Sequence, residues 1–230
     1  TKTKIQSLSD FLDDPPPSVR VGNEEVAVVN DFVYLGVKIS RDCKSDHEIL
    51  RRLQLARSAL GRLGNVWRST KIRSGTILRV LNTCVLPVLF YGSETWTLSA
   101  DMSRRVDAFH RSCLRTILGI RWHHRVRNEE ILRRAGNPFP PSNIIERSRL
   151  RLLGHVARMD SGVPARRVLE AAARLPPDGW RCPRGRPRLT WVAQVSAAQA
   201  LGRTLRLAQD RPGYRSWCWA ATVDNIGHAP

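Results

Sequence analysis

The pattern of the first 40 residues is that of β-structure, with short runs of β-branched residues and, in 31–40, side chains that alternate with a period of two. In "SVRVGNEEVAVV" (18–29), two β-branched runs flank Gly22 and Asn23, and this arrangement predicts a β-hairpin. The alternation in "DFVYLGVKIS" (31–40) predicts one further strand whose successive side chains point to opposite faces. The N-terminal part of the chain is therefore expected to consist of short strands.

From Ser45 the period becomes that of amphipathic helices, because apolar residues now recur every three or four positions. The spacing of Ser45 and Glu48 predicts a capping box, and Pro87 is expected to kink a later helix. Short links favour a bundle of the three helices. The predicted helices cover 45–67, 74–91 and 101–118, with inward residues Ile49, Leu53, Ala56, Leu60, Leu63 and Trp67 in the first, Ile77, Leu81, Cys84, Val88 and Tyr91 in the second, and Met102, Val106, Phe109, Cys113 and Ile117 in the third.

Beyond these helices the pattern predicts a second, more basic helical group. A short helix ends before Gly136, and an amphipathic helix follows over 143–159. Its two faces carry Ile145, Leu152 and Val156 on one side, and Arg147, Arg151 and Arg158 on the other. Residues 174–188 are rich in Pro, Gly and Arg and are expected to be extended, and helical spacing returns at 189–202. The expected fold class is mainly α: a short N-terminal β-hairpin and strands, a helical bundle, and a small basic helical domain.

The charge of the chain is strongly positive and unevenly distributed. The net charge is +18; residues 1–50 hold 6 Lys and Arg against 9 Asp and Glu, whereas the other 180 residues hold 32 against 11. Such an excess favours a polyanionic partner, because each phosphate that is neutralised releases counterions. Arginine, which dominates here, also forks onto phosphate oxygens and stacks on bases. RNA and DNA are therefore the expected partners, and a merely soluble basic surface is the alternative.

The cysteines and the apolar runs restrict the compartment. Five cysteines without a C-x-x-C pair argue against a disulfide framework or a zinc ribbon and fit a reducing compartment. The longest apolar run, "CVLPVLFY" (84–91), is too short to span a bilayer, and no signal peptide precedes it. We expect a nuclear or cytoplasmic protein without a membrane partner. The start without Met suggests a fragment of a longer protein.

Two short motifs point to chemistry and are weighed against simpler explanations. "FLDD" (11–14) has the form of a two-metal site, but three prolines follow directly and forbid a returning hydrogen-bonded strand. We therefore predict no catalytic residue and no metal site in this chain. "RGRP" (184–187) matches the core of an AT-hook, an arm that lies in the minor groove of A·T-rich DNA. Trp180 and Trp191 flank it, which favours an anchored loop that contacts phosphates over a free arm.

Several stretches together resemble one family, the endonuclease/reverse transcriptase of non-LTR (LINE-type) retrotransposons, and specifically its C-terminal portion. The most specific are "LFYGSETWTL" followed by "LRTILGI" and a tryptophan, and "RGRPRLTW" near the end, which the family also carries. The other matching stretches are "KTKIQ", "FVYLGVKIS", "EILRRLQLARSALGRLGNVW", "RLLGHVARM" and "AQDRPGYRSW", in the family's usual order.

The resemblance implies a domain plan and a role. Residues 1–43 would be the last palm and primer-grip strands, 44–122 a thumb-like bundle, 123–178 a helical C-terminal region, and 179–230 an Arg/Pro-rich loop with terminal helices. The chain would hold the RNA and DNA of a template–primer. It would lack the palm and fingers, and therefore the catalytic aspartates and the Mg²⁺ that the intact RNA-directed DNA polymerase uses. A domesticated DNA- or RNA-binding module and a non-functional relic remain alternatives.

Two groups of residues are expected to contact nucleic acid. The resemblance assigns the primer-grip residues and the first lysines, and the arginine-rich helix faces and loop supply the rest. The full set is Lys2, Lys4, Tyr34, Leu35, Gly36, Arg51, Arg57, Arg62, Arg68, Arg147, Arg151, Arg158, Arg184, Arg186 and Arg188.

Overall fold

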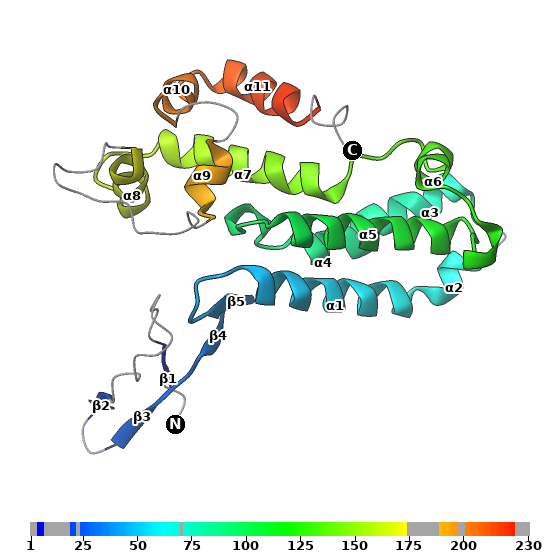
Figure 1. Cartoon of the computed structure of the whole chain (residues 1–230), viewed down its shortest axis with the longest axis horizontal. Helices are drawn as coiled ribbons and strands as arrows, with labels where there is room; N and C mark the ends of the chain where they lie inside the picture. The colour runs from blue at the N-terminus through cyan, green and yellow to red at the C-terminus, as the bar shows by residue number, and fades with distance from the viewer. Residues whose placement is uncertain are drawn as a thin grey trace. The chain divides into compact units, whose positions relative to one another are not determined.

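The computed structural model describes residues 4–6, 19–21, 24–69, 71–173, 189–196 and 201–223. The described residues are mainly helical, with short strands confined to the N-terminal part, as the sequence predicts (Figure 1). The chain divides into two compact units. The first comprises Thr1–Gly92 and Arg115–His124, and the second comprises Ser93–Leu114 and Arg125–Pro230.

Two small sheets begin the first unit. Strand β3 (Glu24–Val28) pairs in parallel with β1 (Lys4–Ile5) and antiparallel with β2 (Val19–Val21), so the predicted β2–β3 hairpin pairing is confirmed. Strands β4 (Asp31–Tyr34) and β5 (Val37–Ser40) form a second antiparallel pair in which Tyr34 lies opposite Val37.

The prediction of one strand through 31–40 is wrong, because the chain reverses at Leu35 and Gly36. Both residues have positive φ, 47° and 79°, as a two-residue type I′ turn requires. Leucine is uncommon in this conformation, and a Leu-Gly pair is not the usual signal for such a turn. The residues predicted to form a primer grip therefore sit at a hairpin tip, where Tyr34 ends β4 and Leu35 and Gly36 form the turn.

Helices form the rest of the first unit. They are α1 (Asp46–Arg62), α2 (Gly64–Trp67), α3 (Ser74–Val80), a π-helical segment η1 (Leu81–Val85), α4 (Leu86–Phe90) and the 3-10 turn η3 (Trp122–His124). Helix α1 packs against η1 and α4, and its core residues Ile49, Leu53 and Ala56 are buried as predicted. The predicted capping box does not form: Ser45 makes no side-chain cap hydrogen bond, and Glu48 is buried in other contacts.

The kink predicted at Pro87 takes the form of the π-helical segment that precedes it. Proline has no N–H and its ring crowds the preceding turn, and a wider π turn accommodates one extra residue. The inward positions after Leu81 therefore move by one, from the predicted Cys84 and Val88 to Val85 and Leu89. Cys84 is exposed, so this part of the predicted core is wrong.

The second unit contains only helices among its described residues. They are η2 (Ser93–Thr95), α5 (Ala100–Ile117, whose last three residues belong to the first unit), α6 (Asn128–Arg134), α7 (Pro141–Ala157), α8 (Pro164–Ala173), α9 (Trp191–Val195), α10 (Leu201–Leu207) and α11 (Arg211–Val223). The five predicted inward residues of α5, from Met102 to Ile117, are all buried. Helix α7 is central: it contacts η2, α8, α9 and α11.

The core of the second unit is built where α7 meets its neighbours. It comprises Leu150, Leu153, Ala157, Leu169, Val195, Ala208, Tyr214 and Cys218. Because α7 is covered on several sides, its buried arc is wider than one amphipathic stripe. Arg147, which the sequence placed on the solvent side, is consequently buried, whereas Arg151 is exposed as predicted. None of the helices within the described ranges is long and apolar enough to cross a membrane.

Candidate nucleic-acid interface

The β4–β5 hairpin tip is fixed to α1 and to the end of α4. Arg51 Nη1 donates to the Gly36 carbonyl oxygen at 3.1 Å, and Arg52 Nη2 donates to the same oxygen. The hydroxyl of Tyr91 donates to the Leu35 carbonyl oxygen at 2.8 Å. Both carbonyls of the turn are therefore occupied, which holds the backbone of the tip in place.

A buried carboxylate organises these arginines. Glu48 is 2% exposed and accepts from Arg52 Nε at 2.6 Å and from Arg51 Nη1 at 3.1 Å, as well as from the Lys38 backbone N–H at 2.9 Å. The Arg52 guanidinium also lies over the Tyr91 ring, 4.4 Å from its centroid. A buried ion pair with satisfied hydrogen bonds fixes geometry, since breaking it would leave an uncompensated charge. Arg51 thus belongs to the clamp that holds the tip.

The fixed tip presents side chains to solvent. Tyr34 is 59% exposed and Leu35 is 75% exposed. Arg57 and Arg62 are exposed on α1, and Arg68 is exposed just after α2; we call these three arginines the α1 row. Lys4 is also exposed, in β1. The first unit therefore combines a rigid tip carrying an aromatic ring with a row of cations.

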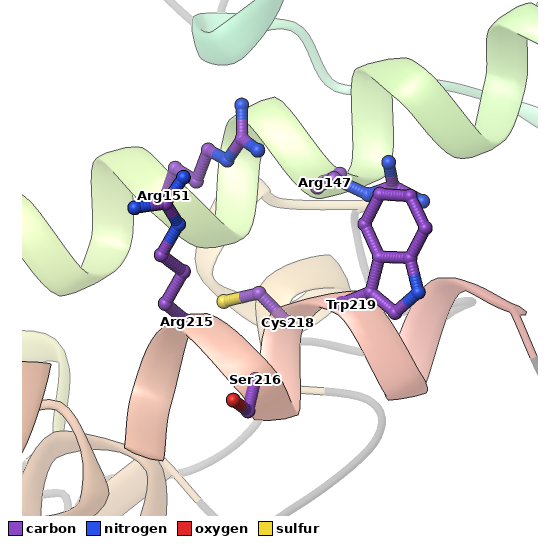
Figure 2. A pocket seen from close by; sticks show the side chains of 6 residues that line it. All are labelled: Arg147, Arg151, Arg215, Ser216, Cys218 and Trp219. Carbon is purple, nitrogen blue, oxygen red and sulfur yellow. The ribbon is translucent and has the colours of Figure 1, made fainter. Parts of the chain in front are cut away.

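In the second unit, α7 and α11 enclose an open pocket of about 370 Å³. Figure 2 shows Arg147 and Arg151 on α7, and Arg215 extending toward α7 from the opposite helix. Ser216, Cys218 and Trp219 complete the lining from α11. The sequences of these two helices contain five arginines and a single acidic residue, Glu146. The pocket lining is therefore cationic with one aromatic wall.

Arg147 is the most constrained residue of the pocket. It is 9% exposed, its guanidinium carbon lies 4.0 Å from the Trp219 ring centroid and 5.1 Å from that of Phe139, and its Nε donates to Thr222 Oγ1 at 3.1 Å. Its Nη2 is buried without a hydrogen-bond partner among the described residues. Burial lowers the pKa of Arg147, and the neighbouring Arg151 lowers it further. The site thus holds a cation whose charge is incompletely compensated.

Cys218, which lines the pocket, and the nearby Tyr214 are both neutral. Burial raises the pKa of the Cys218 thiol and that of the Tyr214 hydroxyl, so both stay protonated at neutral pH. Tyr214 donates to the Leu150 carbonyl oxygen at 2.7 Å, and Arg158 donates to the Ala208 carbonyl oxygen at 2.8 Å. Arg158 is therefore engaged in joining α7 to α10 and does not line the pocket.

The segment after the "RGRPR" motif is anchored. Thr190 caps α9 by accepting from the Ala193 N–H, and Trp191 Nε1 donates to the Glu94 carbonyl oxygen at 2.7 Å. Gln194 pairs with both backbone groups of Leu98 and accepts from Arg149 Nη2 at 2.6 Å. The predicted anchoring on the Trp191 side of the motif is confirmed.

The predicted contact residues fall into separate groups. Tyr34, Leu35, Gly36 and Arg51 meet at the hairpin tip, whereas Arg147 and Arg151 meet in the α7–α11 pocket. Lys2, Arg184, Arg186 and Arg188, like the "FLDD" motif, lie outside the described residues. The pocket residues Arg215 and Trp219 were not predicted; their spacing of four on one helix was the available signal.

The described ranges contain no group of three or more His, Cys, Asp or Glu residues that could hold a metal ion. His110 is buried in α5, and burial together with Arg111 lowers its pKa to about 4. His110 is therefore a neutral histidine of the core.

Comparison with known proteins identifies a relative. The chain is 31% identical over 201 residues to an uncharacterized transposon-derived protein of Caenorhabditis elegans, and the match covers 83% of this chain and 68% of that protein. No protein-family model matches the sequence, and no solved structure matches the chain. The chain therefore belongs to the same family of transposon-derived proteins.

Proposed function

We propose that this chain is the C-terminal part of a non-LTR retrotransposon reverse transcriptase and that it holds the RNA and DNA of a template–primer. The observation that carries the proposal is the clamped β4–β5 tip, which exposes Tyr34 and Leu35 at the start of an arginine-bearing helix. Membership of a transposon-derived family and the net charge of +18 support it.

The proposed mechanism is positioning of the strands through their phosphates. Arg57 and Arg62 on α1 and Arg68 just after α2 would neutralise phosphates of the strands, while the rigid tip supports the growing strand by backbone approach and ring contact. The nucleotidyl transfer itself, with its Mg²⁺, would be performed by the palm of a longer parent protein. In this proposal the chain acts in the nucleus or cytoplasm as a binding element and not as a polymerase by itself.

A salt titration with matched variants tests the proposal. The full chain should bind an RNA–DNA hybrid oligonucleotide. The logarithm of its association constant should fall steeply as the logarithm of the salt concentration rises. Arg57→Gln with Arg62→Gln should weaken binding and lower that slope by about one unit for each contact removed. Arg104→Gln with Arg105→Gln is the control, because it removes the same charge from arginines that already pair with Asp101.

Two outcomes would contradict the proposal. The first is absence of binding at low salt, and the second is an equal loss in the α1 pair and in the Asp101-paired control. The second outcome would mean that net charge alone, without the α1 row, accounts for the affinity.

A further inference from the structure

The pocket between α7 and α11 has the features of a built anion site. Three arginines, Arg147, Arg151 and Arg215, are among the residues that line one cavity. Among the residues that line it there is no acidic side chain to neutralise them. Like charges brought together in this way are stabilised when an anion enters, because the ligand replaces the missing counter-charge.

An unsatisfied donor shows where the anion would bind. Arg147 is more than nine-tenths buried, and its Nη2 has no hydrogen-bond partner within the described ranges. A buried N–H of a charged group that lacks an acceptor is costly, so such a group indicates an acceptor that the folded chain itself does not supply. A phosphate oxygen is the acceptor that a guanidinium fork matches best.

The indole at the rim adds a second element of recognition. Trp219 is 50% exposed, and its ring is held in place by Arg147 at 4.0 Å and by Phe139 at 5.5 Å in an edge-on contact. Figure 2 shows the ring standing at one end of the pocket, beside Arg147. A fixed, half-exposed indole next to a phosphate site is suited to stack an unpaired base.

We infer that the α7–α11 pocket binds one nucleotide of a single-stranded RNA or DNA segment, with its phosphate on Arg147, Arg151 and Arg215 and its base against Trp219. The inference rests on the proposed nucleic-acid function and adds a strand preference to it. A base in a duplex is already stacked and paired, so the indole contact is available only to an unpaired nucleotide. The second unit therefore selects single strands, whereas the α1 row of the first unit does not.

Charge-matched variants test the phosphate part. Fluorescence anisotropy would follow the full chain binding a labelled single-stranded RNA 12-mer and, separately, a 12-base-pair duplex. Arg151→Gln with Arg215→Gln should lower the affinity for the single strand about tenfold or more, since charge-assisted hydrogen bonds are lost. Arg203→Gln with Arg206→Gln on α10 removes the same charge from exposed arginines outside the pocket and should change it less than about threefold.

A second pair of variants tests the base part. Trp219→Leu should weaken single-strand binding by about tenfold, the range found for loss of base–aromatic stacking, and leave duplex binding within about twofold. Trp219→Phe keeps an aromatic ring and should restore most of the affinity. Thermal unfolding of each variant establishes that the fold persists, because Trp219 also packs on Arg147.

The outcomes separate the two proposals. If the wild-type chain binds strands but the pocket pair behaves like the α10 pair, the pocket inference is overturned while the proposed function stands. If Trp219→Leu weakens single strand and duplex alike, the strand preference is overturned. If the wild-type chain binds no nucleic acid at low salt, the proposed function fails and the pocket inference fails with it.

Discussion

Replacement of Gly154 by alanine should destabilise the second unit, although alanine is the better helix former. Gly154 lies in α7 beneath the ring of Tyr214 from α11. A Cβ at this position would overlap Cε1 of that ring and lie 2.7 Å from Cδ1. The ring has little room to retreat, because it is buried and its hydroxyl is hydrogen-bonded to the Leu150 carbonyl oxygen.

The magnitude follows from two opposing effects. A Gly-to-Ala change inside a helix ordinarily gains about 1 kcal/mol of stability. Forcing a methyl group into a filled core costs about 1–3 kcal/mol, and more where neither side can move. Since both the helix backbone and the ring are fixed here, we expect the overpacking term to win, with a net loss of about 1–2 kcal/mol.

Urea unfolding followed by circular dichroism measures this loss. Gly202→Ala on α10 is the control, because a Cβ there meets no atom within 4 Å, and its free energy of unfolding should be unchanged or higher by up to about 1 kcal/mol. In a Tyr214→Ala background, Gly154→Ala should lose most of its cost, which gives a coupling energy between the two sites. An unchanged or higher midpoint for Gly154→Ala alone would refute the packing of α11 on α7 described above.

Two further changes test other parts of the chain. Gly36→Val should destabilise the β4–β5 tip by about 1–3 kcal/mol and weaken template–primer binding, because φ at Gly36 is 79°. Asparagine tolerates that conformation, so Gly36→Asn should retain stability and binding. Equal melting and binding of the two variants would exclude the left-handed turn. Folding lowers the pKa of His110 from 6.5 to about 4, so the unfolded state takes up a proton first as the pH falls. The free energy of unfolding should therefore be highest above about pH 6.5 and decline by up to about 3 kcal/mol toward pH 4. Urea midpoints measured between pH 7.5 and 4.5 should show this slope in the wild type and a reduced slope in His110→Gln, and the same slope in both would assign the proton uptake to another group.

The sequence predicts a helix core well where the helix is buried along one side only, because its apolar spacing then matches the residues that are buried. Helix α5 has one buried stripe, so the period from Met102 to Ile117 was sufficient to find its core. Helix α7 is covered from several directions, and its periodicity could not show that Arg147 is buried. The pocket depends on this packing as well, since Arg147 and Trp219 come together across 72 positions of sequence.

The hairpin tip was missed for a different reason. Turn prediction relies on residues that favour positive φ, and Leu35 is not among them. The conformation of Leu35 is imposed from outside the turn, by Tyr91 on one carbonyl and by Arg51 and Arg52 on the next. These donors lie 15 to 56 residues away in the sequence, so no local pattern could reveal them.

The π-helical segment links the number of residues in this helix to the contact that Tyr91 makes with the hairpin. One extra residue between Leu81 and Val85 turns each later residue by about 100° relative to its place in a regular α-helix. That rotation places Leu89 in the core and brings the Tyr91 hydroxyl to the Leu35 carbonyl. Loss of a single exposed residue such as Cys84 would remove no core side chain and would convert the segment to a regular α-helix, with Leu89 and Tyr91 still on their present sides. Among relatives of this chain, a one-residue deletion in this segment should therefore preserve the tyrosine contact, whereas a further insertion should be as consequential as a substitution of the tyrosine itself.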